Sequence, residues 1–199
     1  MSAEPVKVPL FPLAGHILPG GKMRLRIFEP RYVRMVREAC GQSPTAPIGI
    51  CMLNEEGNSA DNTHIHKFGT LCRIIDFDAL PDSMLGITIA GEQLFAIDAI
   101  ETAADGLRSG TVQLVEHWPA TELAPDDSVL AEHLKAVYSS YPELEVCPDE
   151  ECLSRADWIC QRWLELLPVS ADIKQELLAQ SDCQEALNYL HELVAQSRE

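Results

Sequence analysis

The sequence predicts an α+β fold in which a β-rich N-terminal part precedes an α-helical C-terminal part. Up to about residue 120, apolar residues recur with the period of two that is typical of strands. From about residue 126 they recur every three or four positions, as in helices. Residues 119–127, PATELAPDD, contain two prolines and three acids between these patterns. We therefore expect two domains, 1–120 and 121–199, joined by this hinge.

Alternation is clearest at residues 22–27, KMRLRI, where apolar Met23 and Leu25 alternate with basic Arg24 and Arg26. A half-buried strand places such residues on opposite faces. Turn-forming residues separate the further apolar segments, so we expect a compact barrel or sandwich-like sheet. The other expected strands are residues 48–53, 68–77, 84–90, 93–100 and 111–118.

One helix is expected within the β-rich part, at residues 30–40. Pro30 suits the first helical position, where the missing N–H has no consequence. Phe28 and Val33 occupy the two positions of a hydrophobic staple, and Glu29 lies where a carboxylate favours the positive end of the helix dipole. The FEPRY segment thus has a structural explanation that requires no chemistry.

The C-terminal part predicts several helices. Apolar residues fall on one helical face within 129–141 and again within 153–167. Ser170 is placed to cap a short helix that runs through residue 178. The motif Ser181-x-x-Gln184 is a capping box that would open the last helix.

The net charge disfavours two classes of partner. The net charge is −16, of which residues 1–40 contribute +4, residues 41–120 contribute −8 and residues 121–199 contribute −12. Such a field repels nucleic-acid phosphates and anionic membranes. The sequence also lacks an apolar run of roughly 18 residues and a secretory signal pattern. We expect a cytoplasmic protein that binds neither nucleic acid nor membrane.

Catalytic and metal-binding motifs are incomplete. The sequence contains no G-x-S-x-G nucleophile elbow, no phosphate-binding glycine loop and no C-x-x-C pair. The seven irregularly spaced cysteines indicate free thiols in a reducing compartment. His64 and His66, with Cys51 and Cys72 on neighbouring strands, are the best metal candidates, but a solvated histidine pair explains them better. We therefore expect no catalytic residues, no metal and no cofactor.

One enzymatic alternative stays open. A small hydrolase or transferase would use a Cys–His pair or a carboxylate pair in a cleft between the two parts. Carboxylates cluster at residues 149–151, although capping and dipole stabilisation of a helix that begins there explain them better.

Three ordered segments resemble the N-terminal substrate-recognition domain of Lon proteases. Residues 8–36 contain P-L-F-P-L, a Pro-Gly turn, a strand and F-E-P-R-Y. Residues 68–97 are similar to the family's G-T-x-A-x-I strand, hairpin and G-x-x-R-F-x-I segment, with Leu94 in place of the arginine. Residues 167–194 resemble its helical part, and the polar loop 54–66 departs from it.

The resemblance implies a PUA-like, β-barrel-like domain followed by a helical subdomain. In full-length Lon this unit precedes ATPase and protease modules, which a chain ending at Glu199 lacks, so we expect a free-standing Lon N-domain-like protein. The fold alone also suggests a PUA-like nucleic-acid binder, an alternative that the net charge opposes.

The function implied by the resemblance is non-catalytic recognition of exposed or unfolded polypeptide segments. A protease or chaperone partner and weak self-association are compatible with it. We expect apolar contacts guided by arginines, with core packing as the alternative for each apolar residue. The expected peptide-binding residues lie in the first loop and at the helix start: Phe11, Leu13, Ile17, Leu18, Arg24, Phe28, Arg31 and Tyr32.

Overall fold

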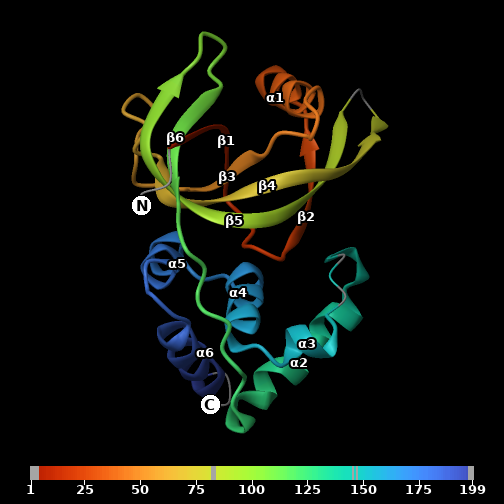
Figure 1. Cartoon of the computed structure of the whole chain (residues 1–199), viewed down its shortest axis with the longest axis vertical. Helices are drawn as coiled ribbons and strands as arrows, with labels where there is room; N and C mark the ends of the chain where they lie inside the picture. Colours follow the sequence, from red (N-terminus) through yellow and green to blue (C-terminus); the bar gives the residue numbers. More distant parts are fainter. Residues whose placement is uncertain (1–4, 82–83, 145, 147, 197–199) are drawn as a thin grey trace. The chain divides into compact units, whose positions relative to one another are not determined.

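The computed structural model describes residues 5–81, 84–144, 146 and 148–196. The chain divides into two compact units, Met1–Glu116 and His117–Glu199, which we call the β unit and the helical unit. Figure 1 shows strands and one α-helix in the first unit and helices in the second. The predicted α+β class is confirmed.

Six strands form the sheet of the β unit, in the order β2-β5-β4-β3-β1-β6. β1 and β3 run parallel, and the other neighbours are antiparallel. β5 also pairs with β6, so the hydrogen-bonded order from β5 through β4, β3, β1 and β6 returns to β5. The strands are β1 (Val6–Leu13), β2 (Lys22–Ile27), β3 (Ile48–Leu53), β4 (Ile65–Ala79), β5 (Leu85–Thr102) and β6 (Arg108–Leu114).

Strands β2 and β3 have the predicted bounds. β4 is longer than predicted at both ends, β6 begins and ends before its predicted bounds, and β1 and β5 differ more. The two prolines in β1, VKVPLFPL, conceal it, because proline weakens a strand pattern. β5 joins two expected strands through Gly91. The backbones of Gly20 and Gly21 bond to Gly91 at 2.9 and 3.0 Å, and a Cβ on Gly91 would clash with the Leu18 carbonyl. Gly91 therefore permits close approach of another segment without ending the strand.

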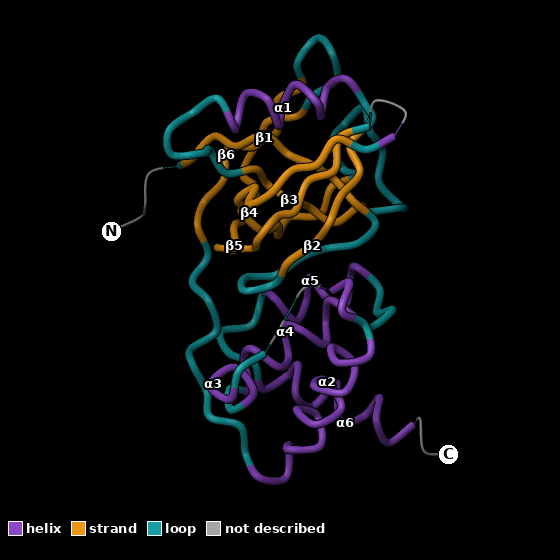
Figure 2. Tube along the Cα trace, turned by 90° about the vertical axis from the view of Figure 1, so that its right-hand side faces the viewer, coloured by secondary structure: helices purple, strands orange, loops and turns teal. Residues whose placement is uncertain are grey.

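Helix α1 (Pro30–Cys40) has the predicted bounds, with Pro30 at its start. Its buried residues, Tyr32, Met35, Val36 and Ala39, belong to the same apolar cluster as sheet residues such as Ile50 and Ile89. Figure 2 shows the helix lying above the strands. The expected staple leaves Phe28 70% exposed, so most of this ring stays in solvent.

A second cluster surrounds Phe95, which is fully buried. Gly69 faces this ring: a Cβ there would lie 2.6 Å from Phe95 Cζ and 2.7 Å from the Ile50 carbonyl oxygen. These distances are shorter than packed atoms tolerate, so the position requires glycine. Leu94, which replaces the arginine of the resembling motif, is 3% exposed and part of the core.

The helical unit contains five α-helices within the described residues. Trp163 of α4 donates its indole N–H to the Leu130 carbonyl of α2 at 3.1 Å, and Trp118 donates to the Gln180 carbonyl at the same distance. The helices are α2 (Ser128–Ser140), α3 (Glu150–Leu153), α4 (Ala156–Leu166), α5 (Ala171–Leu178) and α6 (Gln184–Gln196), with 3-10 turns η2 (Pro125–Asp127) and η3 (Pro142–Leu144). Each described helix is too short or too polar to cross a bilayer.

The helix caps confirm one expectation and correct another. Ser170 caps α5, as predicted, by accepting a hydrogen bond from the Ile173 amide. The predicted Ser181–Gln184 capping box is wrong, because α6 begins only at Gln184. The Gln184 amide donates instead to Asp182 Oδ1 at 2.9 Å. Ser181 and Asp182 are consecutive and can both accept a hydrogen bond at a helix start, and sequence spacing alone does not determine which of them does so.

Candidate functional site

A pocket of about 340 Å³ lies in the β unit beside the start of α1. The ends of β1, β2 and β3 contribute to it, together with the first residue of β6. We call it the α1 pocket. Its lining residues are Phe11, Pro12, Leu13, Arg26, Ile27, Phe28, Glu29, Arg31, Tyr32, Leu53, His64 and Arg108.

One wall of the α1 pocket is aromatic. The rings of Phe11 and Tyr32 stack with centroids 4.2 Å apart and planes 29° apart. Both residues are buried, and burial raises the pKa of the Tyr32 phenol. Phe28, in contrast, is the most exposed large apolar residue in the described chain, at 70%. The pocket thus combines a packed aromatic base with an exposed aromatic ring.

Arg31 is held by several groups at once. Its Cζ lies 4.9 Å from the Tyr32 ring centroid, a cation–π contact, and its Nη2 lies 2.6 Å from Glu29 Oε2. Its Nη1 donates to the Gly106 carbonyl at 3.4 Å. Its Nε is buried and has no hydrogen-bond partner in the described part of the chain. Glu29 therefore balances the charge of Arg31, while one donor is left unsatisfied.

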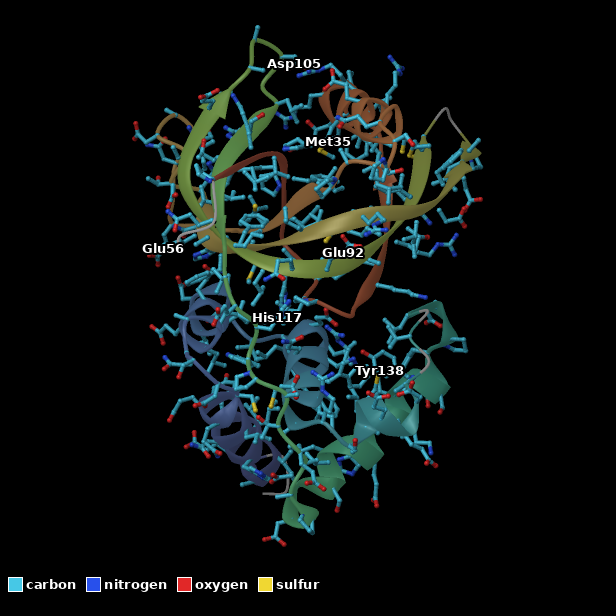
Figure 3. The ribbon with its side chains drawn as sticks, in the orientation of Figure 1. Met35, Glu56, Glu92, Asp105, His117 and Tyr138 are labelled. Carbon is cyan, nitrogen blue, oxygen red and sulfur yellow. The ribbon has the colours of Figure 1, made fainter. Side chains whose placement is uncertain are left out.

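The turn between β5 and β6, which carries Gly106, is fastened to α1. Arg34 donates from Nε and Nη2 to the two carboxylate oxygens of Asp105 at 2.7 and 2.9 Å. Figure 3 shows Asp105 at the tip of this turn, next to α1. The bidentate geometry fixes orientation as well as distance. This ion pair therefore positions the carbonyl that Arg31 contacts.

Arg108 connects the pocket to the polar loop between β3 and β4. Its Nε donates to Asn62 Oδ1 at 2.8 Å, and its Nη2 donates to the Ser59 carbonyl at 3.2 Å. Asn62 has a φ of 59°, a left-handed conformation that asparagine adopts more readily than most residues. The loop that departs from the family pattern is thus ordered against a pocket residue.

His64 lies at the end of that loop. Burial, and then the charge of Arg108, lower its pKa, so the imidazole is neutral at pH 7. Its Nδ1 is buried without a hydrogen-bond partner among the described residues. Two buried nitrogens of this pocket, on Arg31 and His64, therefore lack hydrogen-bond partners among the described residues, a condition that is uncommon in folded proteins.

The pocket carries net positive charge in a chain of net charge −16. Glu29 is its one carboxylate among the described residues, and Arg31 pairs with it. Neither Arg26 nor Arg108 forms an ion pair within the described residues. Two guanidinium groups of the pocket thus have no ion-pair partner in the part of the chain that the structure describes.

The structure brings together five of the eight residues expected from sequence. The three outside the pocket are Ile17 and Leu18, which are only 2% and 1% exposed, and Arg24, which pairs with Asp78 at 3.4 Å. Core packing accounts for Ile17 and Leu18, because the turn after them bonds to Gly91. The five that line the pocket are Phe11, Leu13, Phe28, Arg31 and Tyr32, and their binding role stays a prediction.

Seven residues that line the pocket are outside the expected peptide-binding set: Pro12, Arg26, Ile27, Glu29, Leu53, His64 and Arg108. Strand alternation places Arg26 on the same face as Arg24, which was a usable signal. No local pattern connects Leu53, His64 and Arg108 with α1, because they arrive through strand pairing over long sequence distances.

The other sequence candidates have structural explanations. Cys51 and Cys72 are buried, and burial raises the pKa of the Cys51 thiol, which disfavours a metal-binding thiolate. Within the described ranges, no three His, Cys, Asp or Glu side chains lie close enough to hold a metal ion. Asp149 caps α3, accepting from the Cys152 amide at 2.8 Å, as its capping interpretation predicted.

Comparison with known proteins agrees with this architecture. A Lon N-terminal domain protein from Xanthomonas campestris, solved by crystallography, is 30% identical, with a TM-score of 0.72 over 94% of this chain and 98% of that one. The N-terminal domain of a Mycobacterium avium complex Lon protease shares the fold at 16% identity, with a TM-score of 0.60 over 94% and 97% of the two chains.

A curated relative and a family model extend the comparison. A Lon protease of Flavobacterium johnsoniae is 23% identical over 116 residues, which span 58% of this chain but 14% of that protein. The family model of the ATP-dependent protease La (LON) substrate-binding domain matches residues 7–196, nearly the whole chain. The chain therefore belongs to the Lon substrate-binding domain family.

Proposed function

We propose that the α1 pocket is a non-catalytic recognition site for exposed or unfolded segments of other polypeptides. The observation that carries the proposal is Phe28, an aromatic ring that is 70% exposed at a pocket lined mainly by apolar and basic residues. The family to which the chain belongs is described as substrate-binding, which supports a role in recognition.

The physical basis is burial of apolar surface that a folded partner would keep hidden. An incoming apolar side chain would cover Phe28 and contact Leu13 and Leu53, which are partly exposed in the same pocket. Covering an aromatic side chain stabilises a complex by about 1.5–3 kcal/mol. The arginines would orient the segment through its backbone carbonyls and acidic groups.

The pocket's chemistry supports binding rather than reaction. Its described lining includes no serine, cysteine or lysine, and its histidine has no nucleophile beside it. Tyr32 has a raised pKa, so its phenol stays protonated near neutral pH. Recognition without bond cleavage is the function that these groups fit, and it replaces the hydrolase or transferase alternative in this proposal.

Bound segments would be passed to a protease or chaperone partner, as the family's association with Lon proteases suggests. We place this function in the cytoplasm, where irregularly spaced free cysteines are stable. The six described cysteines are free thiols, and four of them are buried.

A binding titration tests the proposal. The full chain is titrated into a fluorescently labelled model protein that is kept unfolded by reduction and alkylation, with the native form of that protein as control. Binding of the unfolded form alone is expected, with slowed hydrogen exchange at residues 26–32. No binding at high micromolar concentration, or protection confined to the helical unit, would contradict it.

A further inference from the structure

The α1 pocket contains two guanidinium groups whose charge the described chain does not balance. Arg26 is exposed on β2, and within the described residues Arg108 donates only to neutral oxygens, those of Asn62 and Ser59. Arg31, by comparison, already has Glu29 at 2.6 Å. The free positive charge of the pocket therefore comes from Arg26 and Arg108.

Charge complementarity identifies the chemical group that the pocket would accept. The charge of Arg108 acts on both Tyr32 and His64. It opposes the burial that raises the pKa of Tyr32, and it adds to the burial that lowers the pKa of His64. An anion in the pocket would interact favourably with the same charge. A planar carboxylate matches the fork of guanidinium N–H donors, and such charge-assisted bonds are roughly twice as strong as neutral ones.

Size and composition favour a carboxylate that is attached directly to an apolar residue. At about 340 Å³ the pocket lies near the lower end of the roughly 300–1,000 Å³ typical of ligand pockets, so it suits one or two residues. The last residue of a polypeptide carries its side chain and its carboxylate on one Cα. It could therefore contact Phe28 and Leu53 while its carboxylate meets the arginines.

We propose that the α1 pocket binds the carboxyl terminus of a polypeptide whose last side chain is apolar. This inference rests on the proposed function. Arg26 and Arg108 bind the α-carboxylate, and the wall formed by Leu13, Phe28 and Leu53 contacts the side chain. Terminal carboxylates are recognised by converging donors in other peptide-binding proteins, so the mode has physical precedent.

Three labelled peptides test this with the full chain. The first is Gly-Ser-Gly-Ser-Gly-Ser-Leu-Ala-Phe with a free carboxyl terminus, and the second is the same peptide amidated at that terminus. The third is also amidated but has aspartate in the next-to-last position, which supplies a side-chain carboxylate instead. Fluorescence anisotropy measures each affinity.

We expect the free acid to bind at least about tenfold more tightly than either amidated peptide, the range for losing a hydrogen-bonded charge. Arg26→Gln should remove most of this preference. Arg26 is exposed and unpaired among the described residues, so its replacement leaves the fold intact. Arg37→Gln, a matched change at an exposed arginine of α1 outside the pocket, should preserve the preference.

Arg108→Gln is the second pocket variant, and its thermal unfolding midpoint shows whether the loop contacts survive. Equal binding of the first two peptides would overturn the proposal, as would equally tight binding of the aspartate peptide. In both cases the proposed function stands if the unfolded model protein still binds. If that protein fails to bind as well, the proposed function is the part that fails.

Discussion

Replacing Phe28 by alanine separates binding from folding, because the ring is 70% exposed in the folded chain. Full burial of a phenylalanine side chain contributes about 1.5–3 kcal/mol. A bound segment that covers the exposed 70% would therefore gain about 1–2 kcal/mol, which corresponds to a roughly 5–30-fold change in Kd. The remaining 30% of the Phe28 side chain is already buried in the folded chain, so its removal should lower the folding stability by only about 0.5–1 kcal/mol.

Phe77 provides the matched control. It is 67% exposed, lies on β4 and belongs to a separate groove with Val33 and Leu85. Phe77→Ala should cost a similar amount of stability and leave binding unchanged. Affinity for the labelled unfolded protein is measured by anisotropy, and stability by urea denaturation. If Phe28→Ala binds like the unmodified chain, or if both variants lose affinity equally, the assignment of the α1 pocket is refuted.

Three further predictions concern the fold and its pH dependence. Gly69→Ala forces a Cβ against Phe95 and the Ile50 carbonyl, so urea denaturation should show a loss of about 1–3 kcal/mol or more; an unchanged midpoint would contradict the packing. The pKa of His64 is lowered from 6.5 by folding, so the unfolded chain takes up a proton first and stability falls as pH drops below about 6.5. His64→Gln should make the unfolding midpoint less dependent on pH between 7 and 5, and an unchanged slope would show that His64 is not the responsible group. Ser170→Ala should destabilise the chain by about 0.5–1 kcal/mol through loss of the α5 cap, whereas Ser181→Ala should have little effect; thermal denaturation would reveal the reverse order if the cap assignment were wrong.

Local sequence patterns predicted the elements whose stabilising contacts are local or periodic. Helix α1 begins at Pro30 because proline suits the first turn, and its buried residues Tyr32, Met35, Val36 and Ala39 fall at helical spacing. The alternation in β2 and the short apolar run of β3 gave their correct bounds. The pocket residues at the start of α1 that were expected from sequence are Phe28, Arg31 and Tyr32, which lie within five consecutive positions.

Structure that depends on contacts between distant segments could not be predicted from local sequence patterns. β1 is a strand despite Pro9 and Pro12 because β3 and β6 pair with it on either side. β5 continues through Gly91 because the segment at Gly20 and Gly21 packs against it. In both cases pairing with another strand or segment decides the local structure. That partner is distant in the sequence, so the residue pattern of the segment itself does not indicate it.

The sequence by itself determined the fold class, the family resemblance and the aromatic and basic character of the segment around Phe28. Only the tertiary structure placed Arg108 and His64 beside that segment and buried Ile17 and Leu18 in the core. The physical reason is that side-chain period is a property of a few consecutive residues. The charge and exposure of a pocket, by contrast, depend on which strands pair across the whole β unit.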